Sequence, residues 1–163
     1  MNRKDEERAL TEDKVQTLEE RILNVRRVST KRAGGAAYHF SVLAIVGDRN
    51  GKIGIGVAKS KENMVAMRKA VNRAKRNVFS IPLTDKGSIA FEVSSKYGAS
   101  KLFMKPAPLG AGIIAGGSVR QILELVGIKN ISAKIIGSTN KINNAYATNI
   151  ALKRLDRRSV TKD

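Results

Sequence analysis

A glycine-rich segment and a large excess of cations are the two features of this sequence that could act on phosphate groups. The segment at residues 108–117, PLGAGIIAGG, precedes apolar residues at helical spacing, as do the loops that hold the phosphates of nucleotides. Its glycine spacing fits neither the dinucleotide-binding pattern nor the P-loop, and no acidic residue follows about twenty positions later. The segment could instead let a helix pack closely against a strand, or present a helix N-terminus to an RNA phosphate or a partner's carboxylate.

Side chains typical of catalytic centres do not form a recognisable set. The chain has no cysteine and a single histidine, His39, which lies within an apolar strand pattern. This composition excludes a disulfide scaffold, a cysteine nucleophile and the usual structural zinc sites. Acidic residues beyond position 20 are scattered, so they predict neither a carboxylate pair nor a magnesium site. We therefore expect no enzyme activity, no cofactor, no metal and no small-molecule substrate.

The charge of the chain is the strongest chemical signal. Lysine and arginine number 31 against 14 acidic residues, which gives a formal net charge of +17. An excess of this size is costly in a folded protein unless a polyanion neutralises it, and the backbone of a nucleic acid is such a polyanion. A merely soluble basic surface and an anionic membrane are the alternatives. Aromatic residues make up only 4% of the chain, which favours contact with duplex RNA over stacking of single-stranded bases.

The N-terminal half has the pattern of a three-stranded antiparallel meander followed by a helix. Strands are predicted at residues 21–28, 38–46 and 52–57, with a loop at 29–35 and a hairpin at Asn50-Gly51, although a helix at residues 11–24 stays an alternative. Gly54 and Gly56 leave room for a packed helix or an RNA backbone. Ser60 is predicted to cap a helix reaching about residue 79. Its predicted apolar stripe consists of Met64, Met67, Val71, Ala74 and Val78.

The C-terminal half alternates strands and helices. Strands are predicted at residues 88–94, 100–106 and 131–136, with one helix closed by Gly127 and another following residues 137–140. Proline and turn residues at 81–87 predict a boundary. The expected organisation is a mobile acidic extension (1–19), a first domain (20–80), a linker (81–87), a second domain (88–156) and a basic tail (157–163).

Cations on the first strand, the turns and the first helix are the candidates for RNA contact. The predicted RNA-binding residues are Arg26, Arg27, Lys31, Arg32, Gly34, Gly35, Arg49, Lys52, Lys59, Lys61, Arg68, Lys69, Arg73, Lys75 and Arg76. The helix cations occur without an interleaved acid, whereas a solvated face usually mixes both signs. A protein interface is predicted at Gly112, Gly116, Gly117 and Arg120.

Four segments taken in order resemble the bacterial small-subunit ribosomal protein S5 family. They are GDRNGKIGIG at 47–56, the basic helix, GIIAGG at 112–117 and GSTN at 137–140. The resemblance covers about residues 20–155. It implies an α+β fold in which an N-terminal sheet and helix like a double-stranded-RNA-binding domain precede a C-terminal α/β two-layer domain of the ribosomal protein S5 domain 2-like type.

This resemblance also implies a cytoplasmic, ribosome-associated protein that binds small-subunit ribosomal RNA. The implied roles are subunit assembly, decoding accuracy and a position beside the channel through which messenger RNA enters, with proteins S4 and S8 as neighbours. Residues 31–35 resemble a loop that reaches into RNA near the site of spectinomycin action, although Ala36 stands where the family often has arginine. The competing hypotheses are a free-standing duplex-RNA-binding regulator and a nucleotide-dependent RNA enzyme that uses residues 110–117.

Overall fold

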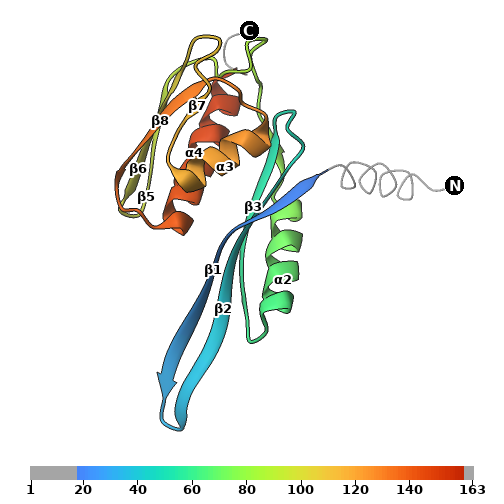
Figure 1. Ribbon diagram of the computed structural model, residues 1–163, viewed down its shortest axis with the longest axis vertical. Coiled ribbons are helices and arrows are strands. Elements are labelled where there is room, and N and C mark those ends of the chain that lie inside the picture. Colours follow the sequence, from blue (N-terminus) through green and yellow to red (C-terminus); the bar gives the residue numbers. More distant parts are fainter. Residues whose placement is uncertain (1–17, 160–163) are drawn as a thin grey trace, which may run out of the picture.

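Two four-stranded sheets and three helices make up the part of the chain that the structure describes (Figure 1). The computed structural model describes residues 18–159, with side chains described as far as residue 156. The predicted extension at 1–19 lies almost wholly outside this range, and so do the side chains of the predicted tail at 157–163. None of the described helices is long and apolar enough to cross a membrane.

The predicted antiparallel meander is confirmed, and a short fourth strand joins it. Its strands, in spatial order, are β1 (Glu19–Arg32), β2 (Gly35–Gly47), β3 (Lys52–Ser60) and β4 (Phe79–Ser80). Because β3 ends opposite Phe40, the β1–β2 hairpin continues beyond it as a two-stranded arm that projects from the molecule (Figure 1).

The structure corrects the predicted loop at residues 29–35. Lys31 and Arg32 belong to β1, where they pair with Ala36 and Gly35 of β2. Strand pairing continues to the tip because Gly35, with a φ of +127°, closes the turn immediately after Gly34. The arm therefore carries its terminal cations on paired strands.

Helix α2 (Asn63–Arg76) packs against the meander through its alanines. A Cβ atom at Gly54 or Gly56 would overlap the backbone of Ala74 or Ala70, so the glycines accommodate a packed helix. The predicted stripe is wrong at Met64, which is 61% exposed. The close approach of α2 to Gly54 and Gly56 leaves room only for small side chains at the centre of the contact. The buried residues are Ala66, Ala70 and Ala74.

The predicted ends of this helix are also wrong. Ser60 is the last residue of β3, and Glu62 occupies the N-cap position without a side-chain hydrogen bond. The strand pairing of Ser60 with Phe40 holds its backbone extended and removes it from the cap. The helix ends at Arg76, and Phe79 instead pairs with Ile53 of β3.

Helices α3 (Gly117–Val126) and α4 (Lys141–Ser159) cover one face of the second sheet. The left-handed residue Gly127 (φ +94°) ends α3 as predicted, and the N–H of Ile142 donates to the side chain of Asn140 at the start of α4 (3.1 Å). The sheet consists, in spatial order, of β5 (Val93–Tyr97), β6 (Ser100–Pro106), β8 (Ile131–Gly137) and β7 (Ile113–Ile114).

The predicted strand at residues 88–94 is wrong at residues 88–92, because β5 begins only at Val93. Pairing begins only at Val93, opposite Met104. If the same register continued two residues beyond the pair of Val93 and Met104, Pro106 would lie opposite residue 91. Proline has no N–H with which to extend the ladder of hydrogen bonds. Ile89 is buried in the irregular segment that precedes the strand.

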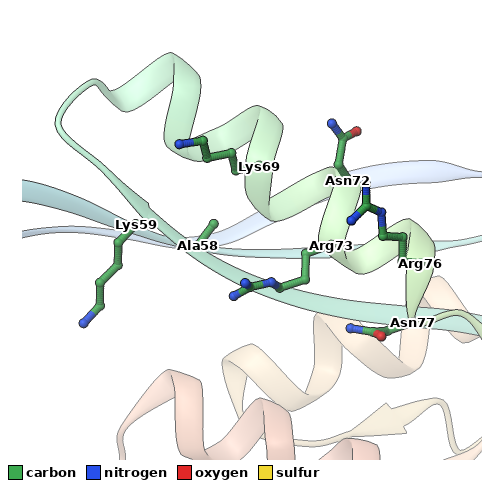
Figure 2. Close-up of a pocket in the computed structure, with 7 residues that line it drawn as sticks. All are labelled: Ala58, Lys59, Lys69, Asn72, Arg73, Arg76 and Asn77. Carbon is green, nitrogen blue, oxygen red and sulfur yellow. The ribbon is translucent and has the colours of Figure 1, made fainter.

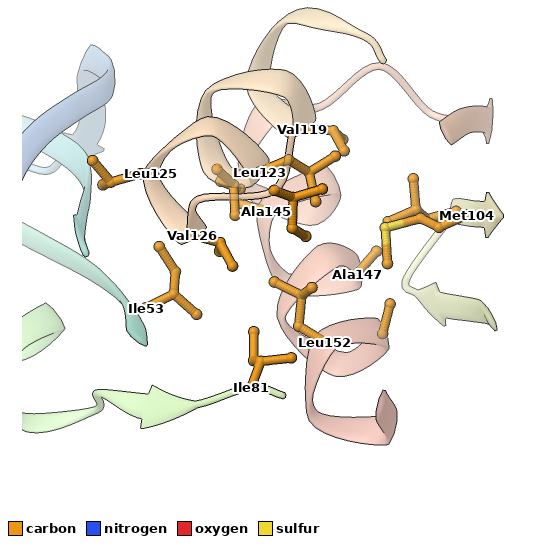
Figure 3. Packing of buried hydrophobic residues seen from close by; sticks show 14 of the residues in the cluster. Ile53, Ile81, Met104, Val119, Leu123, Leu125, Val126, Ala145, Ala147 and Leu152 are labelled. Carbon is orange, nitrogen blue, oxygen red and sulfur yellow. The ribbon is translucent and has the colours of Figure 1, made fainter. Parts of the chain in front are cut away.

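One apolar core joins both sheets. Leu43 and Ile45 of β2 belong to the same buried cluster as Leu123 of α3 and Leu152 of α4, and Figure 3 shows side chains from both halves converging there. The turn after β2 also docks on α3, since the N–H of Arg49 donates to the carbonyl of Leu125 (3.0 Å). Helix α2 and the arm therefore lie outside the common core. The predicted domain boundaries stay a prediction.

Candidate nucleic-acid interface

A basic groove lies between α2 and β3 (Figure 2). It is a hollow of about 670 Å³. Four of its lining residues are cationic and none is acidic. The lining residues are Ala58, Lys59, Lys69, Asn72, Arg73, Arg76 and Asn77.

Helical spacing and an open sheet edge position these cations. Lys69, Arg73 and Arg76 are separated by four and three residues, which places them on one face of α2. β4 pairs only with Lys52 and Ile53, so the rest of the outer edge of β3 has no partner strand among residues 18–159. Arg73 reaches across to this edge, and its Nη1 donates to the carbonyl of Val57 (2.7 Å). The arginine is thereby fixed at the floor of the groove.

The groove is suited to binding a row of phosphates. From residue 69 to residue 76 the helix rises about 10 Å, so its cations can face successive anionic groups along a backbone. Arginine and lysine are also the side chains that most often contact nucleic-acid phosphates. The groove lining has no aromatic residue that could stack on a base. This arrangement favours contact with backbone and shape, as expected for duplex RNA.

The arm carries the second group of predicted RNA-binding residues. Arg26, Lys31 and Arg32 are exposed, as are Gly34 and Gly35 at the tip. The guanidinium of Arg27 lies 4.0 Å from the ring centroid of Tyr38 on the neighbouring strand, a cation–π contact that orients the arginine. Lys31 and Arg32 are consecutive strand residues, so they point to opposite faces of the arm.

Three of the predicted RNA-binding cations form ion pairs with acidic side chains of the same chain, and their contact with RNA stays a prediction. Nη2 of Arg49 lies 2.8 Å from Glu19, and Nζ of Lys75 lies 2.6 Å from Glu20. Nζ of Lys52 lies 4.0 Å from its neighbour Asp48. Sequence reasoning missed the partners Glu19 and Glu20 because their positions opposite these cations depend on the tertiary fold. Lys61 and Arg68 are exposed but do not line the groove.

A network of ion pairs connects β1 to α3 at the junction between the two halves. Arg21 pairs with Glu19 (2.9 Å) and with Glu124 of α3 (3.4 Å), and Arg120 pairs with Glu124 (3.0 Å). The hydrogen bond from Arg21 is the largest cause that lowers the pKa of Glu19 below its usual 4.5, with loss of hydration opposing it and Arg49 adding to the decrease. Arg21, Arg49 and Arg120 therefore form ion pairs with acidic residues of this chain, whereas the groove lining contains no acidic residue.

Both halves of the chain match one protein family. Residues 18–82 match the model for the N-terminal domain of ribosomal protein S5, and residues 95–161 match the model for its C-terminal domain. A small ribosomal subunit protein uS5 of Thermotoga maritima is 47% identical over 154 residues, which cover 94% of this chain and 86% of the relative. The chain belongs to the ribosomal protein S5 family. This confirms the resemblance and the expected α+β fold.

Relatives from other lineages agree with this assignment. A small ribosomal subunit protein uS5 of Wigglesworthia glossinidia brevipalpis is 44% identical over 144 residues, covering 88% of this chain and 86% of the relative. A small ribosomal subunit protein named uS5c of Guillardia theta is 45% identical over 145 residues, which cover 89% of this chain and 86% of the relative. Ribosomal protein S5 is a structural and non-enzymatic family, so the expectation that the chain is not an enzyme is confirmed.

The glycine-rich segment of this S5 family member is engaged by its own side chains. The N–H groups of Gly110 and Gly112 donate to Oδ1 of Asn130 (3.1 and 3.3 Å), so the amides that a nucleotide phosphate would need are already satisfied. A Cβ atom at Gly116 would come within 2.9 Å of Ile135, which favours the close-packing interpretation. Gly117 begins α3. The protein interface predicted at Gly112, Gly116, Gly117 and Arg120 stays a prediction.

Proposed function

We propose that this chain is a structural component of the small ribosomal subunit in the cytoplasm, and that it binds small-subunit ribosomal RNA through the basic groove and the arm. The observation that carries the proposal is the groove itself, with four cations, no acidic lining residue and an arginine fixed to the strand edge. Family membership supplies the context, because the relatives are named small ribosomal subunit proteins.

The mechanism is neutralisation of phosphates by a rigid surface. α2 is packed on the sheet through its alanines, so the groove cations keep a fixed spacing when RNA binds. The arm extends about 20 Å beyond Phe40, at about 3.3 Å for each strand residue, and can insert its terminal cations between RNA segments. Binding at two separate places on one body would fix the RNA segments relative to each other, which supports subunit assembly.

The finer roles of the chain follow from the resemblance to the family. We place it beside the channel through which messenger RNA enters the subunit, with S4 and S8 as neighbouring proteins and an effect on decoding accuracy. The surface around Gly112, Gly116, Gly117 and Arg120 is the proposed protein contact. The exposed Leu109, at 68%, supports it, since apolar exposure beside a glycine-rich segment is typical of an interface.

The salt dependence of binding to duplex RNA tests the groove. If about six phosphates are neutralised, the logarithm of affinity falls against the logarithm of salt concentration with a slope of about −4 to −5. Reversal of the groove cations by Lys69→Glu, Arg73→Glu and Arg76→Glu flattens this slope. The matched control reverses the exposed residues Lys86, Lys129 and Lys141, which lie outside the groove and the arm.

An unchanged slope in the groove variant, or an equal flattening in the control, contradicts the assignment. Sedimentation of a cell lysate tests the ribosomal context separately. A subunit component travels with the small subunit through a sucrose gradient, whereas a free-standing duplex-RNA regulator stays near the top. Near-ultraviolet circular dichroism checks that every variant is folded.

A further inference from the structure

The second sheet has an outer face that α3 and α4 leave uncovered (Figure 1). Exposure alternates along β6, where Leu102 and Met104 are buried while Lys101, Phe103 and Lys105 are exposed. Phe103 is 36% exposed. A large aromatic side chain is therefore presented to solvent at the middle of a sheet, in a chain with few aromatic residues.

Strand register places lysines on three sides of this phenylalanine and Ser94 of β5 on the fourth. Phe103 lies opposite Lys134 of β8, and its strand neighbour Lys101 lies opposite Lys96 of β5. Ile136, which is 53% exposed, lies opposite Lys101 on the other side. We call these residues the outer lysine face, which consists of Lys96, Lys101, Phe103, Lys105, Lys134 and Ile136.

The charges of this face are unbalanced. None of the strands β5, β6, β7 and β8 contains an acidic residue, and none of the four lysines forms an ion pair within the described part of the chain. Lys96 and Lys101 stand directly opposite each other, and like charges at such positions destabilise a sheet. A bound anion would remove this repulsion.

A hollow beside Phe103 extends the face to the edge of the sheet. Its volume is about 360 Å³, and its lining includes Phe103, Lys96 and Lys101 together with Arg154 of α4. A guanidinium N–H of Arg154 donates to the carbonyl of Ser94 at the edge of β5. The hollow therefore combines an aromatic ring with three cations from two strands and a helix.

We propose that the outer lysine face binds an unpaired RNA strand, with one base stacked on Phe103 and the adjoining phosphates on Lys96, Lys101 and Lys134. Aromatic platforms flanked by cations are the recurring means of binding single-stranded nucleic acid. A duplex keeps its base faces stacked internally and would leave Phe103 and Ile136 without a partner. The site goes beyond the proposed function, because it uses other residues and another form of RNA than the groove does.

Binding of a fluorescently labelled oligouridine to the full chain tests this site. The measurement is made with duplex RNA present at saturation, so that the groove is occupied. Phe103→Leu preserves an apolar side chain but removes the stacking ring, and we expect it to weaken oligouridine binding about tenfold. Phe103→Tyr keeps the ring and is expected to bind like the original chain.

Charge variants provide a second measurement that does not depend on the ring. Lys101→Gln with Lys134→Gln flattens the salt slope of oligouridine binding and leaves the slope of duplex binding unchanged. The groove variant with three reversed cations shows the opposite pattern, so failure at one site is distinguishable from failure at the other. Equal thermal unfolding midpoints establish that the comparison concerns binding.

Three outcomes would overturn the proposal. Phe103→Leu could bind oligouridine as tightly as the original chain, which would exclude stacking. Oligouridine could be displaced in proportion to added duplex RNA, which would show that it binds at the groove. A polyglutamate peptide could bind more tightly than oligouridine and depend equally on Lys101 and Lys134, which would assign the face to an acidic protein.

Discussion

The basic groove and the junction between the two halves contain the same kinds of cation in opposite surroundings. In the groove, Lys59, Lys69 and Arg76 have no acidic partner within the described residues. At the junction, Arg21 and Arg49 bind carboxylates of the same chain. Within the described part of the chain, the groove cations thus have no acidic partner that would compete with an external polyanion, whereas the junction cations are already paired with acids of this chain.

The difference between the two regions shows that a cation's role depends on its neighbours in space. Glu124 lies 103 residues from Arg21 in sequence, and Glu19 lies 30 residues from Arg49. A high density of lysine and arginine predicts RNA binding for the whole chain. It does not separate the cations that line the groove from those that pair with acids of the same chain.

The largest effect that separates the two regions is expected at a junction glycine. Gly127 has a φ of +94°, and a Cβ atom there would overlap the backbone of Arg49. We expect Gly127→Ala to lower the free energy of unfolding by about 2–5 kcal/mol, because left-handed strain and overpacking add. Gly34→Ala at the tip of the arm is the control, since nothing lies within 4 Å of its Cβ position. Urea denaturation measures both, and an equal loss in the two variants would show that the junction is no more sensitive to an added side chain than the arm is.

A smaller effect, on the salt dependence of RNA binding, is expected within α2. This helix contains one lysine that lines the groove and one that is paired with an acid. Lys69 lines the groove, whereas Lys75 pairs with Glu20 at 2.6 Å. Lys69→Gln should reduce the magnitude of the salt slope for duplex RNA by about one, as expected for the loss of one phosphate contact. Lys75→Gln should leave the slope unchanged. Similar changes in both slopes would mean that the pairing of Lys75 does not exclude it from RNA.

Local patterns predicted the elements of the fold well wherever the decisive signal was also local. Alternation of apolar residues predicted β2, and the end of α3 at Gly127 followed from its place after the last apolar repeat. Glycines at 54 and 56 correctly indicated a close approach. The sequence did not show which face of α2 packs against these glycines. Only the packed sheet excludes the larger Met64 and leaves space for Ala66 and Ala70.

The candidate site could be predicted only in part, because helical spacing is a local signal whereas the pairing of cations with acids depends on the fold. Helical spacing alone brought Lys69, Arg73 and Arg76 to one face, and the groove preserves that arrangement. Asn72 and Asn77 were missed, although Asn72 lies on the same helical face and could have been included. The pairing of Arg49 with Glu19 required the fold, since the turn after β2 meets the start of β1 only when the strands are in register.

The smallest expected effect concerns the pH dependence of the junction. The pKa of Glu19 is lowered below 4.5, first by the hydrogen bond from Arg21 and then, against the opposing loss of hydration, by Arg49. A carboxyl group with a lowered pKa stabilises the folded state above its ordinary pKa, and this contribution disappears as the pH falls through the lower value. The difference in Tm between the original chain and Glu19→Gln should therefore be present near neutral pH and shrink below about 4.5. Thermal scans of both proteins, with the exposed Glu92→Gln as control, measure this. A difference that persists unchanged in acid would show that Glu19 acts through packing, and the junction would then differ from the groove in shape more than in charge.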